Sequence, residues 1–179
     1  MRKISAIVFS LCLLTMVGMA QVPTSGNVYF GYSLNYGDTG LTDTGTLNGW
    51  EGSVEGKIFP HIGLVADVSQ QYGTLYVPVL GENASERTSS YLFGPRASFT
   101  VGKFRPFVHA LIGAGYLHES AFDVGEHGEV AYADALGGGV DYHLIPHLSW
   151  RVQLDALQTN FHSSWQNNAR FTTGLAFKF

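Results

Sequence analysis

The sequence is poor in charge, in cysteine and in long apolar runs. Only 13% of its 179 residues are charged, against about 25% in a typical soluble domain. Cys12 is the only cysteine, so the sequence offers no pair for a disulfide within the chain. Beyond the N-terminal segment, no stretch approaches the roughly 20 apolar residues that a membrane-spanning helix needs. The net charge of −4 excludes a nucleic-acid binder on electrostatic grounds.

The N-terminal segment has the features of a secretion signal. A positively charged start is followed by an apolar core over residues 4–17 and by small residues at Gly18 and Ala20. This pattern predicts a cleavable signal peptide over residues 1–20 and a single domain over residues 21–179. The mature chain would contain no cysteine, which is compatible with an oxidising compartment.

Apolar side chains alternate with small or polar ones along most of the remaining sequence. The clearest case is the last stretch, where large apolar or threonine side chains occupy every second position from Phe171 to Phe179 and small or charged ones occupy the positions between. A period of two is that of a β-strand with two different faces. The same pattern predicts eight strands, at about residues 27–36, 49–58, 62–71, 89–100, 105–117, 130–143, 148–157 and 169–179. Pro95 interrupts the fourth and predicts a bulge or a gap in its hydrogen bonding.

The connections between these strands alternate in length. Long polar connections are expected at residues 37–48, 72–88, 118–129 and 158–168, and short turns between the others, two of them with a Pro-His pair. This alternation is typical of an antiparallel up-and-down barrel in a membrane, with both termini and the short turns in the periplasm. A sheet that spans a bilayer must satisfy all its backbone polar groups, so it must close. The fold class predicted is therefore all-β, a closed eight-stranded antiparallel transmembrane β-barrel.

Composition predicts which face of each strand points outward. The less apolar face is mostly Gly, Ala, Ser and Thr with a few charges of both signs, which suits a narrow filled interior better than a water-exposed surface. Aromatic residues on the other face gather near the strand ends, as in the aromatic girdles of membrane proteins. The expected girdle residues are Tyr36, Trp50, Tyr91 and Tyr116 toward the long connections, and Phe59, Phe99, Trp150, Phe177 and Phe179 toward the short turns.

The charges on the inward face are expected to form structural ion pairs. Hairpin geometry places Asp155 opposite Arg170, and Asp141 nearly opposite Arg151. Glu55 is expected near Asp67, a like-charge contact that needs a cation. Arg96 or Lys57 could supply it, because buried carboxylates without partners are costly. Since the charges cancel as pairs, a structural role is favoured over ion conduction.

Several motifs resemble the small OmpA-like or OmpX-like bacterial outer-membrane barrels, and the resemblance spans nearly the whole mature chain. They are residues 50–73, Phe93-Gly94-Pro95-Arg96, residues 105–110, residues 137–141 and residues 174–179. The resemblance implies an outer-membrane location and a monomer in contact with outer-membrane lipids and lipopolysaccharide. It also implies a non-enzymatic envelope-structural or surface-contact role through extracellular loops, with no cofactor. In that family the terminal aromatic residues are read by the barrel-assembly machinery, which assigns Phe177 and Phe179 to a C-terminal assembly signal.

Three alternatives stay open at this point. His162 lies beside two serines, as in a lipid A-modifying hydrolase on the same scaffold, although no acidic residue follows it to complete a triad. Histidines and carboxylates crowd residues 118–129, but their spacing matches no recognised metal site. A soluble periplasmic carrier of the lipocalin type would have the same periodicity, with the apolar face turned inward.

Overall fold

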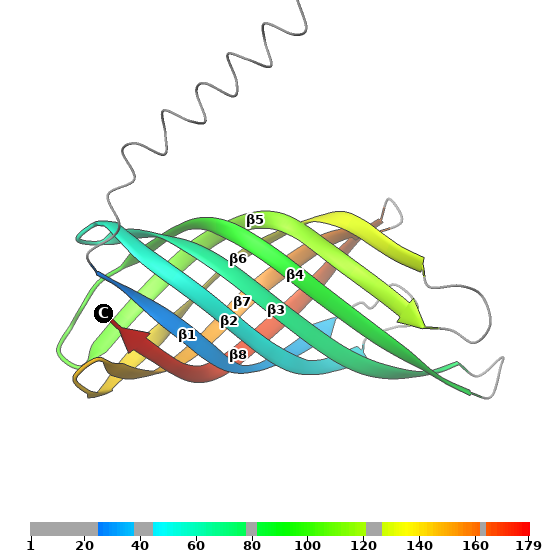
Figure 1. Ribbon diagram of the computed structural model, residues 1–179, viewed down its shortest axis with the longest axis horizontal. Coiled ribbons are helices and arrows are strands. Elements are labelled where there is room, and N and C mark those ends of the chain that lie inside the picture. Colours follow the sequence, from blue (N-terminus) through cyan, green and yellow to red (C-terminus); the bar gives the residue numbers. More distant parts are fainter. Residues whose placement is uncertain (1–24, 38–44, 78–81, 121–126, 162–163) are drawn as a thin grey trace, which may run out of the picture.

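The computed structural model describes residues 25–37, 45–77, 82–120, 127–161 and 164–179, and all of its regular structure is strand (Figure 1). The described part of the chain contains no helix long and apolar enough to cross a membrane. The strands are β1 (Gly26–Gly37), β2 (Gly45–Phe59), β3 (Ile62–Val77), β4 (Glu82–Ser98), β5 (Phe104–Ser120), β6 (His127–Ile145), β7 (Leu148–Phe161) and β8 (Ser164–Lys178).

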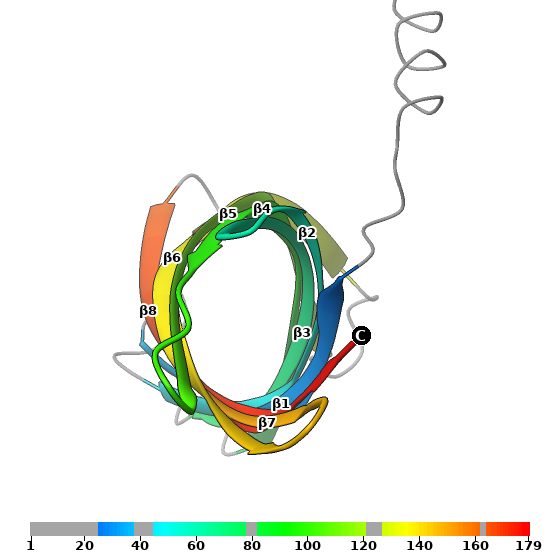
Figure 2. The ribbon, with the colours of Figure 1, turned by 90° about the vertical axis from the view of Figure 1, so that its left-hand side faces the viewer.

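The eight strands form one closed barrel. Each strand pairs antiparallel with its neighbours in sequence, and β1 pairs with β8 to complete the ring (Figure 2). Beyond the end of β8, the Phe179 amide donates to the Gly26 carbonyl at 3.2 Å and the Gly26 amide donates to the Phe179 carbonyl at 3.1 Å. The predicted fold class is confirmed, because the sheet has no free edge.

The strands are longer than the alternation predicted. They contain 12 to 19 residues, whereas about 9 to 11 residues suffice to cross a bilayer. Most of the residues that the sequence assigned to long connections are in fact paired in the strands. The predicted strand bounds at the end of the barrel with the long connections were therefore wrong. The reason lies in the outward positions there, such as Thr46, Asn48 and Asn167, which are polar and exposed. Because polar side chains occupy these outward positions beyond the apolar band, the period-two signal is lost while the hydrogen bonding continues.

Three tight turns close the opposite end. Pro60-His61 and Pro146-His147 each join two strands directly, and the Val101 amide donates to the Phe104 carbonyl at 2.8 Å in the third turn. His147 has a φ of 70° and Gly102 a φ of 61°. The Lys178 amide donates to the His147 carbonyl at 2.7 Å, which helps to hold that unfavourable backbone.

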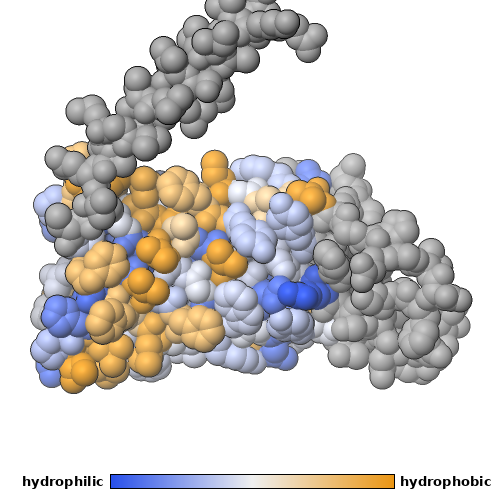
Figure 3. Space-filling view, in the orientation of Figure 1, coloured by the Kyte–Doolittle hydropathy of each residue, from blue (hydrophilic) through white to orange (hydrophobic). Residues whose placement is uncertain are grey.

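The apolar face of the barrel points outward. Large apolar side chains alternate with buried polar ones along each strand, and Phe30 and Leu136 leave 64% and 67% of their surface exposed. Figure 3 shows this apolar surface concentrated toward the short turns and a more hydrophilic surface toward the other end. An inward apolar face, as a lipocalin-like carrier requires, is therefore excluded.

One part of the barrel interior is apolar. The buried side chains of β3 to β7 form a cluster made of Val65, Leu92, Leu111, Ala133, Ala135 and Leu157.

The pairing between β4 and β5 breaks off between Phe93 and Arg96 and resumes in the same register. This gap includes Pro95, which has no amide hydrogen to donate, as the sequence predicted.

Candidate functional site: the charged barrel interior

The candidate site is a network of charges inside the barrel. In the described part of the chain, five inward carboxylates are paired with five inward cations, and a sixth inward cation, Lys178, contacts His143 at 2.9 Å. The paired carboxylates are Glu51, Glu55, Asp67, Asp141 and Asp155, and the paired cations are Lys57, Arg96, Arg105, Arg151 and Arg170. All of these side chains except that of Lys57 are buried. Alternation places them there, since each occupies the inward position of its strand.

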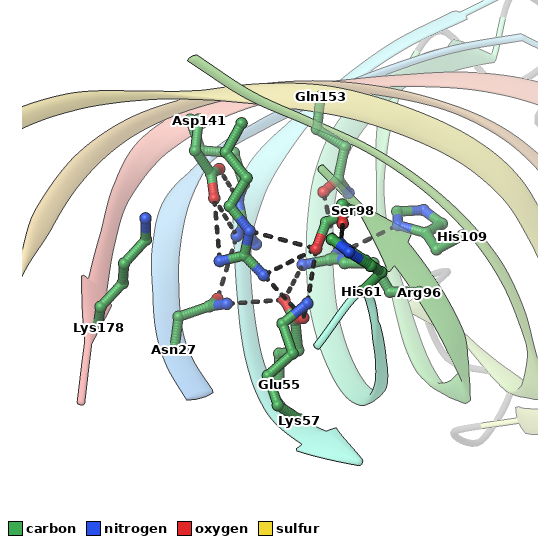
Figure 4. Close-up of polar contacts among 12 residues, drawn as sticks. Asn27, Glu55, Lys57, His61, Arg96, Ser98, His109, Asp141, Gln153 and Lys178 are labelled. Atoms are coloured by element: carbon green, nitrogen blue, oxygen red, sulfur yellow. Dashed lines mark hydrogen bonds and ion pairs between the residues drawn. The ribbon is translucent and has the colours of Figure 1, made fainter. Parts of the chain in front are cut away.

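Glu55 on β2 is the centre of the network near the short turns (Figure 4). Its carboxylate lies 3.0 Å from Lys57 Nζ, 3.1 Å from Arg105 Nη2 and 3.5 Å from Arg96 Nη1. Asn27 donates its side-chain amide to Glu55 Oε2 at 2.7 Å. One carboxylate thus ties together strands β1, β2, β4 and β5.

Asp141 on β6 belongs to the same end of the network. Arg151 on β7 donates to both of its oxygens, at 2.7 and 3.1 Å, in the bidentate geometry that favours strong pairs. Arg105 lies 4.0 Å from Asp141, and Arg151 also donates to Asn27 at 3.1 Å. These contacts link the Asp141 pair to the contacts around Glu55.

Arg170 on β8 is the centre of the network farther from the short turns. Its guanidinium lies 2.7 Å from Asp155, 3.1 Å from Asp67 and 3.4 Å from Glu51, and it donates to Ser69 Oγ at 3.1 Å. These acceptors come from β2, β3 and β7, so Arg170 links strands on opposite sides of the ring. Arg170, Asp155 and Glu51 are all at most 1% exposed.

His109 and Gln153 connect the two ends of the network. The ring of His109 lies between Asp155, 2.9 Å from Nε2, and Arg96, 3.1 Å from Nδ1. Arginine can only donate, so Nδ1 accepts and Nε2–H donates to the carboxylate. Gln153 donates to Glu51 at 3.0 Å and to Asp155 at 2.8 Å, and accepts from Arg96 at 3.4 Å. Both nitrogens of His109 are thereby engaged in structural contacts.

Aromatic rings fill the space beside the arginines. The guanidinium of Arg96 lies 4.3 Å from the centre of the Phe107 ring, and that of Arg151 lies 4.8 Å from the same ring. Arg151 is also 4.9 Å from the ring of Tyr29. Cation–π contacts of this kind gain strength where water is excluded. The interior is thus packed as well as paired.

The structure brings together two of the predicted pairs in adjacent strands. Asp155 lies opposite Arg170 and Asp141 lies opposite Arg151 in the strand register, and each pair is in contact. Glu55 and Asp67 are diagonal neighbours on the inward face and are paired with different cations, Asp67 with Arg170. A register irregularity next to Ile58 places Val65 opposite Glu55 and Ser53 opposite Asp67. Glu55 receives its cations from Lys57 and Arg96, as the sequence allowed.

Sequence reasoning missed Glu51 and Arg105 as members of the network. Both share the parity of inward residues on their own strands, Glu51 with Glu55 and Arg105 with His109, so the alternation could have identified them. Their partners could not be identified in this way, because Arg105 meets Glu55 across the lumen and not along a hairpin.

Other candidates lie outside what the structure describes. These candidates are His162, Ser163, the side chain of Ser164, residues 121–126, and the side chains of His118 and Glu129. Within the described residues, no group of three or more His, Cys, Asp or Glu side chains could hold a metal ion.

No protein-family profile matches the chain, and no curated protein sequence matches it. Solved structures do match. Neisserial surface protein A (NspA) superposes with a TM-score of 0.70 at 9% identity, covering 86% of this chain and 97% of that one.

Two further structures show the same likeness. Ail, the attachment invasion locus protein of Yersinia pestis, has a TM-score of 0.61 at 14% identity, with 87% of this chain and 98% of that one covered. The N-terminal β-barrel domain of Pseudomonas aeruginosa OprF has a TM-score of 0.57 at 14% identity, with 89% and 100% covered. The chain therefore has the fold of the small eight-stranded outer-membrane barrels.

Proposed function

We propose that this protein is a non-enzymatic outer-membrane barrel with an envelope-structural or surface-contact role. The observation that carries the proposal is the ion-paired interior, in which each of five inward carboxylates meets at least one cation, some in adjacent strands and some across the lumen. A fixed filling of paired charges suits a rigid structural element. A conducting pore would instead need a continuous polar path with a surplus of one sign of charge.

The outward surface supports the membrane location. Among the described side chains on the outward face of the strands, only Arg87 and Asp134 are charged. Charged residues on a lipid-facing strand surface are costly near the bilayer midplane, so their scarcity indicates contact with lipid. The long connections would face the cell exterior, and the short turns and both termini would face the periplasm, as is usual in such barrels.

The charge of the loop end indicates what kind of contact it makes. Eight acidic residues lie in or beside the long connections, and Arg87 is the only basic residue there. The acidic residues are Asp38, Asp43, Glu82, Glu86, Glu119, Asp123, Glu126 and Glu129. One structure of Ail holds the heparin analogue sucrose octasulfate, but an acidic surface repels such a polyanion. This end suits cations, including the divalent ions between lipopolysaccharide phosphates, or a basic partner.

Cell fractionation combined with a gel-shift assay tests the proposal. The protein should be found in the outer-membrane fraction and should migrate as a compact species until it is boiled. Single cysteines introduced into the long connections should react with an impermeant maleimide on intact cells, and one at Lys103, in a short turn, should not. Recovery in the soluble periplasm without detergent, or labelling at Lys103 only, would contradict the proposal.

We also propose that Phe177 and Phe179 form the C-terminal signal read by the barrel-assembly machinery, and that the folded barrel is a monomer. Both rings are more than half exposed, so their removal should cost the folded barrel little. Phe179→Ala should reduce the folded fraction in cells several-fold and leave folding into vesicles in vitro unchanged. Equal losses in both settings would show that the ring acts only in stability. Phe104→Ala, an exposed aromatic in a different strand, is the matched control.

A further inference from the structure

An open groove lies on the outer wall of the barrel, across β3, β4 and β5. It has a volume of about 410 Å³ and is lined by Gln70, Arg87, Ser89, Tyr91 and Tyr116. These residues occupy outward positions of their strands, so the groove faces the lipid and is separate from the lumen. Its volume is within the usual range of small-molecule sites.

The groove contains the only cation among the described outward side chains of the strands. Arg87 is exposed and is held over the ring of Tyr72, with 5.7 Å from its guanidinium carbon to the ring centre. No contact between Arg87 and a carboxylate occurs among the described side chains. Asp134, the other outward charge, lies on β6, opposite Ile112 and Gln158, and does not line the groove. Arg87 thus presents donors that no described carboxylate engages.

The groove lies in the aromatic belt at the loop end. Arg87 is the register partner of Tyr72, and Ser89 is that of Tyr116. The rings of Tyr91 and Tyr116 meet edge to face, 5.5 Å apart. Such belts mark the level of lipid headgroups. An anion at this level on the outside of the barrel would be the headgroup of a lipid.

The polar residues of the groove are held in place by one another. Gln70 donates to Ser89 Oγ at 3.0 Å, and the hydroxyl of Tyr72 donates to Gln70 Oε1. A second amide hydrogen of Gln70 and the hydroxyl of Ser89 stay free to bond a ligand. Below them, Tyr91 and Tyr116 offer an apolar edge continuous with the lipid-facing surface.

We infer that this groove binds the phosphorylated sugar headgroup of a glycolipid in the outer leaflet. The phosphate would bind the guanidinium of Arg87, because the arginine fork matches a phosphate in geometry and charge. Sugar hydroxyls would bond Gln70 and Ser89, and an acyl chain would lie along Tyr91 and Tyr116. The inference rests on the proposed orientation, since only then does the groove lie in the glycolipid leaflet.

Native mass spectrometry of the full chain in detergent tests the inference. The probe is monophosphoryl lipid A, compared with the same glycolipid without its phosphate and with phosphatidylglycerol. One monophosphoryl lipid A should bind, about tenfold more tightly than either comparison lipid. Arg87→Gln should reduce that affinity about tenfold, Arg87→Lys should retain most of it, and Lys103→Gln, an exposed cation at the opposite end, should leave it unchanged.

Other results would overturn the inference. Equal binding of the phosphate-free glycolipid would remove the role of Arg87, and equal binding of phosphatidylglycerol would remove the glycolipid assignment. If Arg87→Gln bound monophosphoryl lipid A as tightly as the unaltered chain, the role of Arg87 would likewise be removed. The gel shift shows that each variant is a folded barrel. Lipid results of this kind contradict only the groove, whereas maleimide labelling of the Lys103→Cys variant on intact cells contradicts the proposed orientation.

Discussion

At the scale of single residues, stability depends on charges that share partners across the lumen. Arg170 meets three carboxylates that have no other guanidinium in contact. Burying an ion pair contributes little by itself, but removing one partner leaves an unpaired buried charge at a cost of about 3–5 kcal/mol. Arg170 leaves three such groups, so its loss is expected to be among the most damaging substitutions in the chain.

Arg170→Met should therefore lower the free energy of unfolding by about 3–5 kcal/mol. Urea unfolding in lipid vesicles measures this change. Lys103→Met removes an exposed cation in a short turn and should change the free energy by no more than about 0.5 kcal/mol. Similar losses in the two variants would show that the interior pairs are not what stabilises the barrel.

The sequence could predict some of these contacts because they lie between adjacent strands. Alternation and the position of one turn or loop predict the pairing of Asp141 with Arg151 and that of Asp155 with Arg170. The contacts of Arg170 with Asp67 and of Arg105 with Glu55 join strands that are not neighbours in the sheet. They depend on the diameter and shear of the closed barrel, and no local pattern contains that information.

At the scale of the strands, glycine sets how closely side chains fill the interior. A Cβ atom at Gly174 on β8 would lie 2.2 Å from the Phe30 carbonyl oxygen and 2.3 Å from the Cα of Gly31, its partner on β1. Both contacts involve backbone, which cannot move aside without opening the β1–β8 pair that closes the ring. Alternation reveals that Gly174 points inward, but this crowding depends on the closed structure.

Gly174→Ala should thus destabilise the barrel by about 1–3 kcal/mol through overpacking, measured by urea unfolding in vesicles. Gly52 on β2 is the matched control, since a Cβ there meets nothing closer than 3.7 Å. Gly52→Ala should be tolerated within about 0.5 kcal/mol. If the two substitutions have equal effects, the closing pair of strands has more room than the structure shows.

Strand ends were the part of the fold that the sequence predicted least well. Near the short turns, Pro60-His61 and Pro146-His147 fix the strand bounds to within two residues, because proline cannot continue the ladder. Toward the loops, Gln70 and Ser89 keep the pairing in polar surroundings on both faces. The part of a strand that extends beyond the apolar band toward the loops therefore has the sequence pattern of a loop.

At the scale of the whole molecule, the account depends on the apolar face lying outward against lipid. Trp150 is exposed on the outer wall, and Phe107 is buried inside between two arginines. Both are aromatic residues in strands that a period of two cannot orient by itself. Their opposite positions arise only because the sheet closes with its charges in the lumen.

Quenching of tryptophan fluorescence by brominated lipid tests this claim most directly. Both variants are studied in vesicles. The chain with Trp50→Phe and Trp165→Phe retains Trp150 as its single tryptophan. Adding Phe107→Trp and Trp150→Phe to that chain moves the single tryptophan to the interior. The gel shift verifies that both variants are closed barrels. The account predicts strong quenching of Trp150 and little quenching at position 107; strong quenching at position 107 with Trp150 unaffected would contradict it.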